Sequence, residues 1–204
     1  MRRYSQNEID ELAEILNNDG VISIPTDTVY GVCARINSQK AFDNLVNAKH
    51  RPANKSFPVL CLDEEQIESI AIVNEKAQKL IRAFLPGPMT IVLKKKKEAF
   101  EYINNAGERT SDELAIRILP LEFIKELIKK VGSPLFLSSA NLSGQEVCKT
   151  LEEIEEVFPN IDGIVKGEVS FGKASTIVDC TNEEIKIQRE GPISKEQIME
   201  VLKK

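Results

Sequence analysis

The stretch SQNEIDELAEILNNDGVISIPTDTVYG, residues 5–31, decides the fold class because it places a helix signal directly before a strand signal. A Ser-x-x-Glu capping box opens it and apolar residues then recur at helical spacing, which predicts an amphipathic helix over 5–19. A short apolar run predicts a buried strand over 21–24. The polar residues that close the stretch therefore follow a strand, at the edge where α/β sheets bind ligands.

The rest of the chain continues this alternation of helix and strand signals. Further helices are predicted near 41–48, 74–85, 120–131, 150–157 and 194–203. Further strands are predicted at 58–62, 89–93, 114–118, 134–138, 175–179 and 184–188. The last two strands have hairpin spacing, so the sheet is predicted to be mixed, with helices on its faces. No repeat or flexible linker divides the chain, and residues 1–204 are expected to form a single α/β domain.

Composition and charge exclude several classes of protein. The chain has 204 residues, 42% of them apolar, and its net charge of −5 argues against a surface built to coat nucleic acid. No apolar run approaches the roughly 20 residues of a membrane span, and the N-terminus lacks the apolar stretch of a signal peptide, so we expect a cytoplasmic protein without a membrane partner. Four dispersed cysteines are expected to be reduced and buried, and a single histidine argues against a zinc site, so no metal site is predicted.

Residues 167–174, GEVSFGKA, have the glycine spacing and the lysine of a phosphate-binding P-loop. A P-loop needs Ser or Thr after the lysine to hold magnesium, and a helix that begins there. Ala174 takes that place, and the residues that follow, STIVD, are typical of a strand. We therefore reject a Walker-type nucleotide site.

The PTDTVYG loop offers two hydroxyls and a carboxylate, from Thr26, Asp27 and Thr28. These groups can orient a small polar substrate. They can equally form a turn in which Thr26 and Asp27 bind the local backbone. The sequence leaves both interpretations open.

Residues 35–55 are basic within an acidic chain, with five Lys or Arg against one acid and a local charge of +4. Lys49, Arg51 and Lys55 lie around Pro52, which prevents one uninterrupted helix. From a loop, these three side chains can converge on a polyanion such as a triphosphate. A solvated basic turn is the alternative.

Arg117 lies within LAIRI at 114–118, a strand that is otherwise apolar. An unpaired buried guanidinium would cost several kcal/mol, so Arg117 needs an anionic partner. That partner is either a substrate carboxylate or a structural Asp or Glu. Two more polar segments follow strands, SSANLSG at 138–144 and Arg189 after the last strand.

Taken in order along the chain, these segments resemble the YrdC family, the threonylcarbamoyl-AMP synthases. The resemblance rests on PTDTVYG at 25–31, Lys49-x-Arg51-Pro52 with Lys55, PGPMT at 86–90, AIRI at 115–118, SSANLSG at 138–144, STIVD at 175–179 and REG at 189–191. It implies a twisted open α/β sheet with a large concave basic cavity, and ATP binding without a P-loop. The chain length resembles that of the short, single-domain members.

The resemblance also implies a reaction in which L-threonine, bicarbonate and ATP give L-threonylcarbamoyl-AMP and pyrophosphate. The product serves the modification of the tRNA adenosine beside the anticodon, so a transient contact with a tRNA-threonylcarbamoyl transferase complex is expected. By position, Thr28 and Arg117 would bind threonine. The nucleotide would be bound by Lys49, Arg51, Lys55, Ser139, Asn141, Ser175 and Arg189, with Lys49 and Arg51 required for turnover. Mg²⁺ would accompany ATP, held mainly by phosphate oxygens and water.

Other hypotheses remain open beside this one. The segment 57–62 lacks the histidine that some family members place near threonine. The family's concave basic surface has been linked to double-stranded RNA and ribosome assembly, so a non-catalytic RNA-binding module is the second hypothesis, although no RNA-recognition signature is present. A carbamoyl-transfer domain of a hydrogenase-maturation protein is the third, but the zinc-finger cysteines of such proteins are absent.

Overall fold

The computed structural model describes residues 1–52, 55–99, 112–170 and 172–203. The strands are β1 (Arg3–Tyr4), β2 (Ile22–Ile24), β3 (Gly31–Arg35), β4 (Val59–Leu60), β5 (Ala71–Ile72), β6 (Met89–Lys95), β7 (Glu113–Arg117), β8 (Leu135–Ser139), β9 (Gly163–Val165), β10 (Thr176–Asp179) and β11 (Lys186–Arg189). The helices are α1 (Ile9–Asn17), α2 (Gln39–Lys49), α3 (Glu64–Ile70), α4 (Glu75–Phe84), α6 (Glu122–Val131), α7 (Leu151–Val157) and α8 (Lys195–Lys203).

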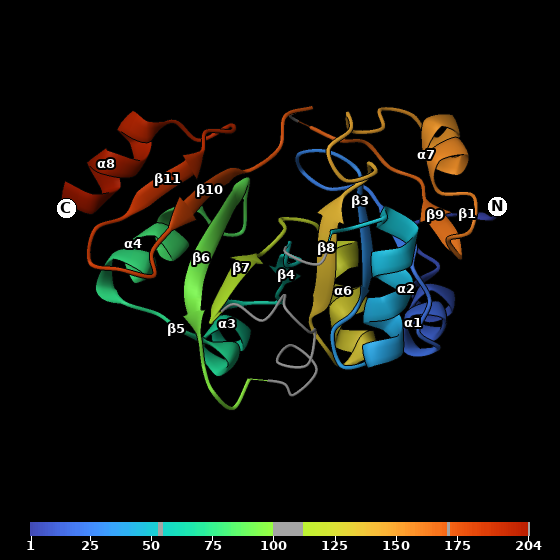
Figure 1. The fold of residues 1–204 in the computed structure, drawn as a ribbon, viewed down its shortest axis with the longest axis horizontal. Coiled ribbons are helices and arrows are strands. Elements are labelled where there is room, and N and C mark those ends of the chain that lie inside the picture. Colours follow the sequence, from blue (N-terminus) through green and yellow to red (C-terminus); the bar gives the residue numbers. More distant parts are fainter. Residues whose placement is uncertain (53–54, 100–111, 171, 204) are drawn as a thin grey trace.

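The strands form one mixed sheet, as predicted. Its order is β1-β9-β2-β3-β8-β4-β7-β6-β10-β11, with β5 paired to β6. β10 and β11 are antiparallel, as their hairpin spacing predicted, whereas β10 is parallel to β6 and β4 is parallel to β7. The sheet spreads along the long axis of the molecule, and the two termini lie at opposite ends of that axis (Figure 1).

Helices pack on both faces of the sheet and divide its apolar residues between two cores. α1 and α6 contact each other and one face of β3 and β8, where Cys33 and Leu135 are buried against them. α2, α4 and α8 contribute to the other core, which takes the alternate residues Val32 and Phe136. Successive residues of a strand point to opposite faces, so this alternation follows from the pleat. The predicted placement of helices on the faces of the sheet is confirmed.

Side chains cap three of the predicted helices, and the start of the first helix is corrected. Asn74 caps α4, Thr150 caps α7, and the Ser194 hydroxyl accepts from the Gln197 N–H at the start of α8. α1 begins at Ile9, whereas the capping-box pattern predicted residue 5. The Glu8 carboxylate does accept a hydrogen bond from the Ser5 backbone N–H, but the two residues close a separate turn before the helix.

Several short elements carry no pattern that the sequence reveals. β1 and β5 have two residues each and β9 has three, which is too short for an alternating pattern to show. β3 has five residues, but four of them are buried, so it shows no polar face either. The sequence therefore missed β1, β3, β5 and β9, although it predicted β2 and β4, which are as short as some of these.

The sheet is narrow at its middle, and this narrowing positions the site. β4 has two residues and joins β8 on one side to β7 on the other. In β6 and β7, Ile91 and Ile116 point into the core beside α4. The alternate residues Thr90, Ala115 and Arg117 line a cavity on the opposite face.

The cysteines agree with a further expectation. All four cysteines are buried and unpaired. Within the described ranges, no helix combines the length and the apolar content that a membrane crossing requires.

Candidate active site

A cavity of about 250 Å³ lies over the narrow middle of the sheet. Its walls come from the β2–β3 loop, the segment before β4, and strands β6, β7, β8, β10 and β11. Six of the nine predicted site residues line it: Thr28, Arg51, Arg117, Ser139, Ser175 and Arg189. The other three, Lys49, Lys55 and Asn141, are not part of the described lining. Segments that are far apart in the sequence therefore meet here, as the resemblance implied.

The β2–β3 loop resolves the two interpretations of PTDTVYG differently for each residue. Thr26 forms a local turn, because its Oγ1 accepts from the backbone N–H groups of Thr28 and Val29 and donates to the Val29 carbonyl. Thr28 lines the cavity, and its hydroxyl lies 2.9 Å from that of Thr26. Asp27 reaches beyond the loop, because its carboxylate pairs with Arg117, and its own backbone N–H also stabilises the ionised form of that carboxyl.

Arg117 is 6% exposed at the end of β7 and is fixed at three points. Nε donates to the Gly87 carbonyl at 3.2 Å, Nη1 donates to the Thr28 hydroxyl at 3.0 Å, and Nη2 donates to Asp27 Oδ1. Of the two partners that the sequence left open, the structure supplies the structural carboxylate. Arg117 still lines the cavity, so it can contact a ligand as well.

The Asp27–Arg117 pair is buried on both sides. Burial raises the pKa of the Asp27 carboxyl, and the charge of Arg117 opposes that shift. The guanidinium remains protonated in any protein environment, so the pair is ionic when Asp27 is deprotonated. The geometry thus places one buried negative charge directly behind a cavity wall.

Lys49 is the last residue of α2 and is 1% exposed, which corrects its predicted place in a loop, while its predicted contact with phosphates stays a prediction. Its Nζ donates to the backbone carbonyls of Ser139 and Asn141, the latter at 2.7 Å. Its own carbonyl accepts from the Ser143 N–H. Burial, together with the charge of Arg51, lowers the pKa of the amino group to about 7. Lys49 therefore holds the turn after β8 from inside the protein.

Arg51 is half-buried and lines the cavity from the segment between α2 and β4. Its guanidinium carbon lies 4.4 Å from the centroid of the Phe57 ring. Nε and Nη2 donate to the backbone carbonyls of Lys55 and Ser56, and Nη1 lies 3.4 Å from the Ser138 hydroxyl. The side chain of Lys55 is exposed, so its contribution to the segment is its carbonyl.

The basic region at 35–55 does not act as one patch. Arg35 pairs with Asp19 at 2.7 Å, and Lys40 lies 4.0 Å from the same carboxylate. With Lys49 buried and Lys55 exposed beside it, Arg51 is the member of the set that reaches the cavity in the described part of the chain. The local charge of +4 therefore overstates the positive charge at the site.

The turn after β8 presents polar groups to the cavity. The Ser139 hydroxyl donates to Asn141 Oδ1 at 2.6 Å. The Asn141 amide nitrogen donates in turn to the carbonyls of Leu142 and Gln145. Asn141 thus braces the turn internally, while Ser139 and Ser138 line the cavity.

The wall opposite this turn is formed by the start of β10 and the end of β11. Arg189 donates from Nε to the Ser175 carbonyl at 2.9 Å and from Nη2 to the Ser175 hydroxyl at 3.3 Å. The Ser175 hydroxyl also lies 2.8 Å from that of Thr90. Gly191 allows this close approach, since a Cβ there would lie 2.4 Å from the Ala174 carbonyl oxygen. Burial lowers the pKa of Arg189.

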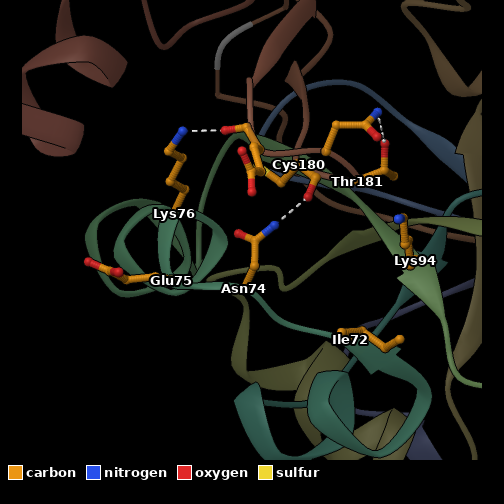
Figure 2. A pocket seen from close by; sticks show the side chains of 9 residues that line it. Ile72, Asn74, Glu75, Lys76, Lys94, Cys180 and Thr181 are labelled. Carbon is orange, nitrogen blue, oxygen red and sulfur yellow. Dashed lines mark hydrogen bonds between the residues drawn. The ribbon is translucent and has the colours of Figure 1, made fainter.

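Two other hollows help to delimit the site. One of about 630 Å³ adjoins the cavity, because Val29 and Ala174 line both. Another of about 640 Å³ lies apart, between the start of α4 and the segment after β10 (Figure 2). Figure 2 shows polar side chains there engaged with the protein itself: Asn74 donates to the Cys180 carbonyl, and Lys76 donates to that of Glu183. The cavity over β4 is therefore the better candidate.

The sequence pattern at 167–174 is not a P-loop, as predicted. The residues after it form strand β10, so no helix N-terminus faces a ligand there. Phe171, within the pattern, lies outside the described residues. Among the residues that the structure describes, no three His, Cys, Asp or Glu side chains cluster as metal ligands.

Sequence reasoning missed two residues of the site. Asp27 was considered only as a substrate contact or a turn residue, and its partner lies 90 positions away. Thr90 belongs to the PGPMT motif, where its hydroxyl pairs with that of Ser175. The motif order carried a signal for both, but only the register of β6, β7 and β10 reveals the contacts.

Three comparisons with known proteins bear on the site. The profile of the Sua5/yciO/yrdC family, described as "Telomere recombination", matches residues 14–191. A putative threonylcarbamoyl-AMP synthase from Methanocaldococcus jannaschii is 39% identical over 182 residues, which are 88% of this chain and 83% of the relative. The threonylcarbamoyl-AMP synthase of Bacillus subtilis is 33% identical over 198 residues, 96% of this chain and 56% of that protein.

A solved structure agrees with these relatives. Sua5 of Pyrococcus abyssi, in complex with L-threonine, superposes with a TM-score of 0.87 at 29% identity. The match covers 98% of this chain and 59% of that one, so this chain spans little more than half of the solved protein's length.

Proposed function

The chain belongs to the Sua5/YciO/YrdC family, and from this premise we propose that it is a threonylcarbamoyl-AMP synthase, a nucleotidyltransferase-type enzyme. The substrates are L-threonine, bicarbonate and ATP, and the products are L-threonylcarbamoyl-AMP and pyrophosphate. The product supplies the threonylcarbamoyl group for tRNA modification. The relatives that carry this name support the proposal over most of the chain.

One observation of the site carries the proposal. Three guanidinium groups, from Arg51, Arg117 and Arg189, line a single cavity together with the hydroxyls of Thr28 and Ser175. Threonine carries a carboxylate and ATP carries a triphosphate, and guanidinium groups bind carboxylates and phosphates through paired N–H donors. A cavity with three such groups in an acidic chain suits two substrates that present these anionic groups side by side.

The roles follow from the depth of each cation. Arg117 and Thr28 lie together on the deep wall and suit the threonine carboxylate and its neighbouring polar groups. Arg51 and Arg189 line the same cavity with more exposed side chains, and the adjoining hollow beyond Val29 and Ala174 leaves room for the rest of the nucleotide. Ser139 and Ser175 are the hydroxyls available to the phosphates or the ribose. Lys49 and Asn141 act by holding the end of β8, which carries Ser139, together with the turn after it.

The reaction proceeds in two bond-forming steps. Bicarbonate separates into CO₂ and hydroxide, and the neutral amine of threonine attacks the carbon of CO₂. The proton that the amine loses joins the hydroxide to leave as water, which gives a carbamate. A carbamate oxygen then attacks the α-phosphorus of ATP, and the bond to pyrophosphate breaks. The arginines orient the two anions and neutralise the charge that collects on the phosphates, so the rate arises from positioning and electrostatics.

Mg²⁺ enters with the nucleotide as part of the substrate. The described residues offer no cluster of three metal-ligating side chains, and the nearby carboxylate of Asp27 is engaged by Arg117. Phosphate oxygens and water are suitable ligands for Mg²⁺ without a protein cage. The ion supplies further charge neutralisation on the triphosphate.

A pyrophosphate-release assay tests the proposal. The protein should release pyrophosphate from Mg·ATP when both threonine and bicarbonate are present, and not when either is omitted. Mass spectrometry of the same reaction should detect threonylcarbamoyl-AMP.

An RNA-binding module would behave differently in parallel measurements. It would bind double-stranded RNA with an affinity that falls steeply as salt rises, because phosphate contacts release counterions. That result, together with pyrophosphate release that does not depend on threonine, would contradict the proposed enzyme.

A further inference from the structure

Asp27 lies in the β2–β3 loop with 5% of its surface exposed. Its Oδ1 accepts a hydrogen bond from Arg117 Nη2. Its Oδ2 is also buried, and within the described part of the chain it has no hydrogen-bond partner. The carboxylate is therefore placed by its contact with Arg117 and not by a full set of structural bonds.

Such a pair is a poor choice for stability alone. Taking a carboxylate and a guanidinium out of water is unfavourable, and well-packed apolar residues in their place often stabilise a protein equally well. Burial raises the pKa of Asp27, which shows the same penalty on its charged form. A buried carboxylate with one oxygen that has no hydrogen-bond partner among the described residues thus points to a role in the site.

The effect of Asp27 is to fix the orientation of Arg117. The other two acceptors, the Gly87 carbonyl and the Thr28 hydroxyl, are neutral, and a hydrogen bond to a carboxylate is the stronger kind. Asp27 and Thr28 come from the β2–β3 loop, while Gly87 precedes β6, so the guanidinium is held from two sides. A guanidinium has five N–H groups. Three serve these partners, which leaves two for a ligand at the cavity wall.

Asp27 has a second effect on Arg117, which concerns the nearby charge of Arg189. Burial lowers the pKa of Arg117, and the positive charge of Arg189 adds to this effect. The carboxylate of Asp27 offsets this repulsion from the buried side. Without it, the guanidinium would lose its strongest anchor and be pushed by a like charge.

We propose that Asp27 is a positioning residue for the amino-acid substrate: it holds Arg117 with two N–H groups available to the threonine carboxylate. This inference rests on the proposed function and names a residue that acts through Arg117 without touching the substrate. It makes threonine binding, and not nucleotide binding, depend on a carboxylate behind the cavity wall.

Steady-state kinetics of the full chain test the inference with two variants and a control. Asp27→Ala removes the anchor, and the KM for threonine should rise about tenfold or more, as for loss of a hydrogen bond to a charged group. Asp27→Asn keeps an oxygen acceptor and should lie between the wild type and Asp27→Ala. In both variants the KM for ATP should stay within about threefold of the wild type. Ser23→Ala, which removes the buried hydrogen bond from Ser23 to the Gly31 carbonyl, controls for loosening of the loop's flanking strands.

The outcomes separate the inference from its premise. A wild-type protein without threonine-dependent pyrophosphate release contradicts the proposed function itself. If the wild type is active, equal rises in both KM values, or a Ser23→Ala variant with the same threonine-specific rise, assign Asp27 a general structural role. A lower KM for threonine in Asp27→Asn would overturn the inference. It would show that repulsion between the Asp27 and threonine carboxylates outweighs the positioning of Arg117. Asp27→Asn keeps the test valid if Asp27→Ala does not fold.

Discussion

Two guanidinium groups face the same cavity and are held in different ways. Arg117 is 6% exposed and donates to a carboxylate, a hydroxyl and a carbonyl. Arg51 is half-buried, lies over the Phe57 ring, and donates to two backbone carbonyls of its own segment. Arg117, on the deep wall, thus has one fixed orientation and a negative charge beside it. Arg51, at the rim of the cavity, is oriented by backbone carbonyls and an aromatic ring. The deep wall suits a small substrate in a single pose, and the rim suits a highly charged one.

Removing Arg117 from the deep wall should have the largest effect. Arg117→Ala leaves the Asp27 carboxylate buried without its counter-ion, and breaking a buried pair in this way costs about 3–5 kcal/mol of unfolding free energy. Threonine-dependent pyrophosphate release should fall by about 100-fold or more as well. Urea unfolding and the release assay measure the two effects.

Two further variants make this comparison specific. Arg82→Ala removes an arginine whose side chain is 73% exposed beside Glu64, and it should change neither measurement appreciably. Adding Asp27→Ala to Arg117→Ala should recover part of the lost stability, since no unpaired charge remains. A double variant less stable than the sum of the single variants would contradict the buried ion pair.

Lys49→Met should have the next largest effect. It also tests whether Lys49 supports the end of β8 and the turn that follows it. The substitution leaves the carbonyls of Ser139 and Asn141 without their donor, which should cost about 2–3 kcal/mol. Turnover should fall because the turn that carries Ser139 is no longer held. Lys76→Met is the matched control, since Lys76 also donates to a carbonyl but is exposed. Unchanged stability with a raised KM for ATP alone would instead indicate that Lys49 contacts the phosphates.

Arg117 and Lys49 also show how far the sequence predicts the structure. The alternation of helix and strand signals predicted the α/β class and the mixed sheet, because elements such as α4 and β6 carry clear caps and apolar runs. The motif order predicted that Thr28, Arg117 and Ser175 share one site, and they do line one cavity. Burial could not be predicted for Lys49, because its partners are backbone carbonyls 90 and 92 positions away, and carbonyls leave no mark in the sequence.

Arg51→Ala should separate the rim from the deep wall. The KM for ATP should rise about tenfold, as expected when one charge-assisted contact to a phosphate is lost. The unfolding free energy should change by less than about 1 kcal/mol, because Arg51 is only half-buried and the carbonyls of Lys55 and Ser56 that it contacts belong to exposed residues that water can reach on its removal. Arg51→Lys keeps the charge and should recover part of the ATP affinity. A selective rise in the KM for threonine would exchange the roles assigned to Arg51 and Arg117.

The last expected effect is a pH dependence of stability that comes from Lys49. Its pKa is about 7 in the folded protein, lowered by burial from 10.5, so between these values the unfolded chain binds a proton that the folded chain does not. Stability from this group is therefore lost as pH falls toward 7 and rises toward pH 10.5, by on the order of 1 kcal/mol per pH unit. A neutral amine keeps two N–H groups, enough for both carbonyls, so the turn stays supported.

Urea unfolding of the wild type and Lys49→Met at pH 7 and pH 9 isolates this contribution, because all other groups cancel in the difference. The wild type should gain stability relative to the variant at the higher pH, and a constant difference would show that the two carbonyls keep Lys49 charged.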